Sequence, residues 1–299
     1  TGKNVPELQP LYNALTETGG TPAGSEGGFL VPIDIDNTIK EFRRAMIALA
    51  DYVNVETVTT LSGWRAVETA KAAQPFALIA EMAQVGAAEE PRFTTLSYNV
   101  AKYGGFIPVS NELLNDNAAN LMAYLGRWMG RKSVLTENSL ILAIINAMTA
   151  VPFVAADGIN NLKQVLNVTL DPAISVNATI LTNQSGFNYL DQLEDLDGRP
   201  LLQPDPTRAT GKLMLGRPVV VAPNSLMPNR NDGTNDFAPV VIGDLREFIT
   251  MFNRMPYEMA STNIGGNAWR TDSTEIRGLV RLDCQQVDDG AAAKLEIQL

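Results

Sequence analysis

A helical repeat of apolar residues dominates the middle of the chain. From Ser110 onward, apolar side chains recur at three- and four-residue steps through Met148, which predicts one helix over residues 110–149. At 1.5 Å per residue, such a helix of about forty residues spans roughly 55 Å. Ser110 suits its N-terminal cap, and Gly126 and Gly130 allow a bend. Few compact enzymes need so long a rod, whereas the subunits of shells and fibres often do.

Shorter patterns on either side of this helix predict a mixture of strands and helices. Before it, residues 34–52 follow a helical period, and strands are predicted at 53–58 and 97–109. After it, short strands and helices alternate over about residues 153–256, as in an α/β block. The expected strands there are 178–182, 219–222 and 240–244, and the expected helices are 160–168 and 185–196. Two last strands, 275–284 and 294–299, complete an α+β chain.

Two segments show neither the helical nor the alternating strand pattern of apolar residues. Residues 1–28 are rich in Gly, Thr, Pro and Glu, and we expect an extended arm that Phe29 and Leu30 anchor. Residues 61–96 form a segment that is long for a loop in a compact domain, yet it carries many large apolar side chains. Among them are Trp64, Phe76, Leu78 and Met82. A projecting loop of this kind needs another surface to cover it.

Composition removes several classes of function. The chain has 299 residues, 23 basic and 33 acidic side chains, a net charge of −10 and no histidine. The missing histidine excludes His-dependent triads and His-based metal sites. One cysteine, Cys284, cannot form an internal disulfide. The acidic balance argues against non-specific nucleic-acid binding as the main activity, although it is compatible with a position beside DNA.

A membrane-spanning segment is not expected. The longest apolar stretch, residues 140–156, is interrupted by Asn146, Thr149 and Pro152. It falls short of the roughly 18–20 residues that a membrane span needs. We therefore interpret it as the buried end of a helix followed by a strand.

Two motifs resemble catalytic or nucleotide-binding loops only in part. Residues 208–212 read Arg-Ala-Thr-Gly-Lys, similar to the end of a phosphate-binding loop, but Pro206 replaces the first glycine and Leu213 the Ser or Thr. Ser25 lies in a Gly-rich stretch close to a nucleophile elbow, but no histidine exists to activate it. We expect neither a nucleotide site nor a catalytic serine.

An acidic cluster is the remaining candidate for a metal site. Glu194, Asp195 and Asp197 could chelate a divalent cation, but a helix end followed by Gly198 accounts for them without one. A metal-dependent hydrolase that uses Asp195 and Asp197 is the catalytic alternative, and it would be a stable monomer with metal-dependent turnover. We predict no catalytic, cofactor-binding or metal-binding residues, and no cofactor.

Five short motifs occur in a characteristic order. They are Gly27-Gly28-Phe29-Leu30-Val31-Pro32, Ile107-Pro108-Val109-Ser110-Asn111-Glu112-Leu113-Leu114-Asn115-Asp116, Asp195-Leu196-Asp197-Gly198-Arg199-Pro200, Leu215-Gly216-Arg217-Pro218-Val219-Val220 and Ile242-Gly243-Asp244. With the long hairpin between the first two, this order resembles the tailed-bacteriophage major capsid protein family with the Hong Kong 97-type fold. The resemblance covers about residues 28–283.

The resemblance implies a division of the chain into structural parts. These are an N-terminal arm (1–31), a first part of a peripheral domain (32–60), an extended loop hairpin (61–96), a second peripheral part with the spine helix 110–149 (97–152), an axial α/β domain (153–256) and peripheral return strands (257–299). It further implies that a chain beginning at Thr1 is the state after a maturation protease has removed a scaffolding segment. A sequence trimmed for another reason would begin in the same way.

The resemblance also implies a function and its partners. The protein is expected to be a non-enzymatic capsid subunit of the virion that assembles in the bacterial cytoplasm, through hexamers and pentamers, into an icosahedral shell. The implied partners are further copies of itself, a portal, a maturation protease, an optional decoration protein and enclosed double-stranded DNA, but no membrane. The expected contacts between subunits are Phe29, Leu30, Trp64, Phe76, Leu78 and Met82. An encapsulin-type nanocompartment shell is the alternative function.

Some members of this family weld neighbouring subunits through a Lys–Asn isopeptide bond assisted by a Glu. Lys71 is the only lysine of the loop and could be the donor. By resemblance, Asp272 occupies the place of the acceptor Asn and Leu279 the place of the assisting Glu. Both departures predict a non-covalent shell.

Overall fold

The computed structural model describes residues 47–68, 76, 78, 79, 84, 90, 92–153, 158–195, 197–206 and 211–299, except for the side chains of 116–120 and 256. The expected arm, with Phe29 and Leu30, lies outside the described residues. So do Met82, Lys71 and most of the helix expected over 34–52. The end of that last segment forms a short 3-10 helix, η2 (Leu49–Tyr52).

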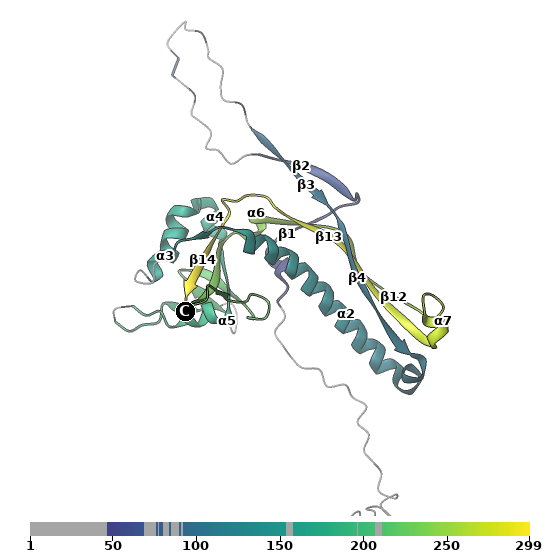
Figure 1. The fold of residues 1–299 in the computed structure, drawn as a ribbon. Coiled ribbons are helices and arrows are strands. Elements are labelled where there is room, and N and C mark those ends of the chain that lie inside the picture. The colour runs from purple at the N-terminus through teal and green to yellow at the C-terminus, as the bar shows by residue number, and fades with distance from the viewer. Residues whose placement is uncertain are drawn as a thin grey trace, which may run out of the picture. The chain divides into compact units, whose positions relative to one another are not determined.

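The long helix is confirmed. α2 (Asn111–Ala147) follows Ser110, whose extended backbone ends the preceding strand (Figure 1). The inner face of its C-terminal half buries Ile141, Leu142 and Ile145. These side chains enter the largest apolar core, which also contains residues of η2 and of both large sheets. The C-terminal half of α2 is therefore held by packing on several elements at once.

A four-stranded sheet packs against α2. Its order is β1 (Asn54–Thr57), β12 (Ile249–Thr262), β13 (Ser273–Gln286) and β4 (Ala101–Ser110). β1 runs parallel to β12, and the other neighbours are antiparallel. The alternation expected for 275–284 is confirmed in β13, where Ile276, Val280 and Leu282 are buried.

A larger sheet of eight strands holds the α/β block. Its order is β5 (Ala150–Val151), β14 (Ala292–Gln298), β11 (Asp236–Gly243), β6 (Thr179–Asn183), β9 (Arg217–Ala222), β8 (Lys212–Met214) and β7 (Leu202–Pro204), and β10 (Arg230–Asn231) also pairs with β11. The helices here are α3 (Ile159–Gln164), the π-helical turn η4 (Val165–Thr169), α4 (Pro172–Asn177), α5 (Gln184–Asp191) and α6 (Leu245–Phe248), while α7 (Ala268–Thr271) follows β12. β6 and β11 are almost wholly buried at the centre of this sheet.

The last strand differs from expectation. Residues 257–299 were expected to return to the part built on the long helix, but β14 pairs with β11 and β5 in the larger sheet. The reason is that both faces of β14 are covered, since consecutive residues 292–295 are all buried. A strand buried on both faces suits the interior of the larger sheet.

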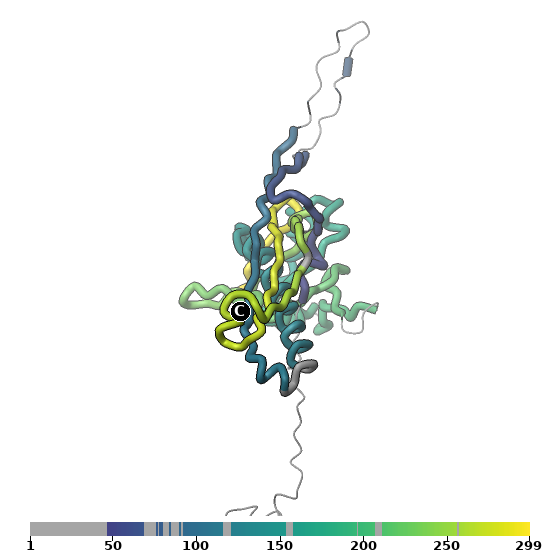
Figure 2. Tube along the Cα trace, turned by 90° about the vertical axis from the view of Figure 1, so that its right-hand side faces the viewer, coloured from purple at the N-terminus to yellow at the C-terminus, as the bar shows by residue number. Residues whose placement is uncertain are grey.

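The single strand expected over 97–109 is also wrong. The chain forms two strands, β3 (Phe93–Asn99) and β4, which belong to different sheets. Between them, the amide of Val100 donates a hydrogen bond to the carbonyl of Leu61 at 2.8 Å. This bond closes a separate two-stranded ladder of β2 (Ser62–Glu68) and β3, so the base of the expected hairpin is confirmed (Figures 1 and 2).

Candidate intersubunit surfaces

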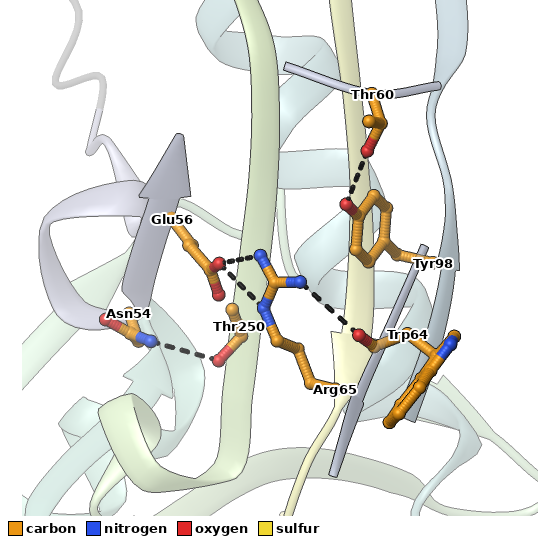
Figure 3. Close-up of polar contacts among 7 residues, drawn as sticks. All are labelled: Asn54, Glu56, Thr60, Trp64, Arg65, Tyr98 and Thr250. Carbon is orange, nitrogen blue, oxygen red and sulfur yellow. Dashed lines mark hydrogen bonds and ion pairs between the residues drawn. The ribbon is translucent and has the colours of Figure 1, made fainter. Parts of the chain in front are cut away.

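The hairpin joins the four-stranded sheet through an aromatic stack. Tyr98 of β3 lies flat on Phe252 of β12, with ring centroids 4.4 Å apart and an angle of 18° between the rings. Tyr98 is only 4% exposed, and its hydroxyl shares a 2.8 Å hydrogen bond with Thr60 Oγ1 (Figure 3). Val58 and Val100 complete this small core. The stack fastens the hairpin to the sheet by burying an aromatic pair.

An ion pair adds a second connection at the same place. Arg65 of β2 reaches Glu56 of β1, with Nε donating to Glu56 Oε1 at 2.9 Å and Nη2 also donating to that oxygen. The hydrogen bond to Glu56 raises the pKa of Arg65. The guanidinium also lies 5.5 Å from the centroid of the Tyr98 ring (Figure 3). Since β1 is paired with β12, this contact links the hairpin to the sheet edge.

The ladder register separates the hairpin into two faces. Residues opposite each other in a ladder share a face, and successive residues alternate. Tyr98 lies opposite Gly63, and Arg65 opposite Leu96, so these residues share the face that meets the sheet. Trp64 opposite Ser97 and Phe93 opposite Glu68 lie on the other face. Trp64 and Phe93 are each 65% exposed there, so this face presents two large aromatic rings to its surroundings.

The other sequence-predicted contact residues are partly described. Phe76 is 92% exposed and Leu78 is fully exposed. Phe29, Leu30 and Met82 lie outside the described residues. The sequence analysis did not single out Phe93, although alternation from Trp64 across the ladder identifies it once the register is known.

Further apolar groups are exposed away from the hairpin. Ile264 and Trp269 lie at the connection between β12 and β13 and are 75% and 79% exposed. Phe106 of β4 is exposed beside α2. Sequence reasoning missed all three, because a loop tryptophan or one strand phenylalanine gives no period from which exposure can be predicted.

The helix expected over 185–196 ends at Asp191, so the acidic cluster is not a helix end but a turn beyond it. The Asp195 carboxylate accepts hydrogen bonds from the backbone amides of Asp197 and Arg199, both at 2.9 Å. Gly198 has a φ of 76°, which suits glycine.

Throughout the part of the chain that the structure describes, no group of three or more Asp, Glu, Cys or His side chains is placed to hold a metal ion. Burial raises the pKa of Cys284 to about 12, so its thiol is a poor nucleophile.

The start of the described chain is tied to α2 by one side chain. Asn138 is fully buried and accepts a 2.8 Å hydrogen bond from the amide of Leu49 through Oδ1. Its Nδ2 donates to the carbonyl of Ile47 at 2.7 Å. The side-chain amide thus pairs with the backbone as a neighbouring strand would, and it holds residues 47–49 against α2. Of the helices described, none is long and apolar enough to cross a membrane.

Comparison with known proteins gives consistent matches over most of the chain. The model of the phage capsid family matches residues 27–297. Among solved structures, the capsid of a native GTA particle aligns with a TM-score of 0.75 and 17% identity, covering 94% of this chain and 99% of that one. Gordonia phage Cozz gives 0.65 and 16%, covering 92% and 93%, and Microbacterium phage Oxtober96 gives 0.63 and 13%, covering 91% and 98%. No curated protein sequence matches the chain.

Proposed function

Because the chain belongs to the phage capsid family, we propose that it is the major capsid protein of a tailed phage and assembles through hexamers and pentamers into an icosahedral shell around double-stranded DNA. Its fold is the Hong Kong 97-type capsid fold. The observation that carries the proposal is the exposed aromatic face of the hairpin, which the chain fastens to its sheet but leaves uncovered.

Burial of this face on other subunits is the driving force of assembly. Apolar surface removed from water contributes about 25 cal/mol per Å². A standard interface buries about 800 Å² per partner, and each subunit in a shell forms several such interfaces. Contacts that are modest one by one become stable together because each further contact is made within an already connected assembly. The anchors are Trp64, Phe76, Leu78 and Met82 of the hairpin and Phe29 with Leu30 of the arm.

The same proposal assigns roles to the parts of the chain. Residues 1–31 act as an arm, 61–96 as the extended loop, and the α/β block of 153–256 as the domain around the hexamer and pentamer axes. A portal, a maturation protease and an optional decoration protein are the other partners. The net charge of −10 supports enclosure of DNA without tight binding to it. The role is structural rather than enzymatic, and assembly takes place in the host cytoplasm.

Deletion of residues 62–92 tests the role of the hairpin. The shortened chain is expected to give a soluble, folded subunit but no particles in negative-stain electron microscopy. Normal shells from this variant would contradict the proposal.

A point variant separates the aromatic face from the hairpin itself. Trp64→Ser with Phe93→Thr keeps both strands and removes the two exposed rings, so we expect particle yield to fall steeply while the subunit stays folded. Thr95→Ser, on the same face, is the matched control and should assemble normally. Particles that contain DNA support the phage shell, whereas a co-purifying enzyme would favour the nanocompartment.

A further inference from the structure

A pocket lies in the α/β block, where the helical segments α3, η4 and α4 meet the start of β9. It encloses about 220 Å³, and the residues that line it are Lys163, Leu166, Asn167, Ser175, Leu215 and Arg217. Its polar groups are therefore an ammonium, a guanidinium, a carboxamide and a hydroxyl. None of these lining residues is acidic, so the pocket is suited to a negatively charged ligand.

The two cations of the pocket have no counter-ion in the fold. Other basic side chains of the same sheet are matched with carboxylates, in the pairs Lys212–Asp191, Arg230–Glu296 and Lys294–Glu296. Within the described residues, by contrast, no ion pair joins Lys163 or Arg217 to a carboxylate. In a chain with a net charge of −10, this pocket is a site of uncompensated positive charge.

The guanidinium of Arg217 also carries an unsatisfied donor. Its Nε is buried and has no hydrogen-bond acceptor among the described residues. A buried N–H group without an acceptor costs free energy, and the cost is larger on a charged group. An occupant that places oxygen atoms beside this guanidinium would remove the cost. Arginine suits such a ligand because its planar fork of donors binds several oxygen atoms of one oxyanion.

Two unusual backbone segments meet at this pocket. η4 is a π-helical turn, a rare form that is frequent at functional sites, and it contributes Leu166 and Asn167 to the lining. The two-residue turn between β8 and β9 holds Leu215 at a φ of 53° and Gly216 at 74°. Such turns favour Asn, Asp or Gly at both positions, so a leucine there is strained. Strained residues cluster at ligand-binding sites.

We propose that this pocket binds a phosphate group, either as inorganic phosphate or as the terminal phosphate of a small ester. Lys163 and Arg217 neutralise its charge, and Asn167 and Ser175 donate hydrogen bonds to its remaining oxygen atoms. Duplex DNA is a less suitable ligand, because two cations offset little of the repulsion between its phosphates and a chain of charge −10. The pocket belongs to the folded subunit, so its occupancy does not depend on the proposed shell.

Isothermal titration calorimetry of the full-length chain tests the site. With inorganic phosphate at neutral pH and constant ionic strength, we expect saturable binding of one phosphate per chain with a Kd on the order of 1 mM. Adenosine monophosphate distinguishes the two sources, since tighter binding than that of inorganic phosphate identifies an ester and weaker binding the free ion. Absence of saturable phosphate binding, acetate that binds as tightly as phosphate, or a short DNA duplex that displaces phosphate would overturn the assignment.

Substitutions of single cations locate the binding site. Lys163 is exposed, so Lys163→Gln should fold normally yet weaken phosphate binding about tenfold, through the loss of one charged hydrogen bond. Arg217→Gln should weaken it at least as much, with circular dichroism to verify that this half-buried site still folds. Lys212→Gln is the matched control, because it removes the same charge from the same sheet outside the pocket lining, and its affinity should be unchanged. Unchanged binding in Lys163→Gln, or an equal loss in Lys212→Gln, would contradict the proposal.

Discussion

Glu137 of α2 is a carboxyl group held in surroundings that disfavour its charge. Burial raises its pKa, a hydrogen bond from Ser133 lowers it in part, and the nearby Asp51 raises it further. A carboxyl with a raised pKa in the fold binds its proton more readily there than in the unfolded chain. Its ionisation therefore costs stability at neutral pH, and this cost disappears as the pH falls below the usual carboxyl range.

Replacing Glu137 should reveal this cost. We expect Glu137→Gln to raise the free energy of unfolding at pH 7 by up to about 0.5 kcal/mol, a small value because the group is half-exposed and screened by solvent. The gain should vanish near pH 4. Denaturant unfolding of dissociated subunits at both pH values measures it. The exposed Glu68→Gln is the control, and a gain for Glu137→Gln that persists unchanged at pH 4 would show that packing rather than charge is responsible.

For single residues, the sequence predicts which chemical groups are available better than it predicts which neighbours surround them in the fold. The need for glycine at position 198 follows from residue identity, but the expected helix over 185–196 ends at Asp191, so the acidic cluster forms a turn and not a helix end. The role of Gly63 could not be foreseen, since it depends on Tyr98, 35 positions later, lying opposite it. Trp64 was recognised as a large apolar residue in a loop, but only the register shows that it shares a face with Phe93.

The hairpin and its sheet are coupled where Gly63 passes Tyr98. A Cβ on Gly63 would lie 2.5 Å from the Tyr98 hydroxyl oxygen and 2.7 Å from the ring carbon that bears it. We expect Gly63→Ala to displace Tyr98 from Phe252 and to lower stability by about 1–3 kcal/mol through overpacking. Gly105→Ala, also in a strand but with open space around its Cβ, should stay within about 0.5 kcal/mol of the parent.

Denaturant titration of subunits gives these stabilities, and near-ultraviolet circular dichroism follows the packing of Tyr98. An equal effect of Gly63→Ala and Gly105→Ala would show that strand glycines as such, rather than the contact with Tyr98, determine the outcome.

Among the helices and strands, those with a regular local repeat of apolar residues could be predicted from the sequence. α2 was found almost to the residue because apolar side chains recur at helical spacing along most of its 37 residues. The division of 97–109 into β3 and β4 was missed, because a strand that passes from one sheet into another keeps the same local composition. The partner of β14 was missed for a related reason: the sequence marks a strand as apolar but does not say which sheet buries it.

For the whole molecule, the main prediction concerns covalent linkage. The Asp272 carboxylate accepts a 2.6 Å hydrogen bond from Asn111 Nδ2, and Asp272 is not the amide that an isopeptide bond with lysine requires. Leu279, at the place of the assisting glutamate, is apolar and lies opposite Gly104 in the ladder. We expect mature particles boiled in detergent to give one band at the subunit mass of 32.3 kDa. A ladder of multiples would contradict a shell held by non-covalent contacts.

The strand β12 (Ile249–Thr262) runs from the main core, past the base of the hairpin, to the exposed turn before β13. β12 begins at Ile249 in the core shared with the larger sheet, places Phe252 under the hairpin and leads to the exposed turn of Trp269. Its register with β13 shifts twice, between Asn253 and Met255 and between Met255 and Glu258. A shift of this kind bends the strand, as a β-bulge does. These positions therefore share one continuous backbone. In the proposed assembly, neighbours that contact these surfaces would all act on this one strand, so we expect a poor fit at one contact to weaken the others.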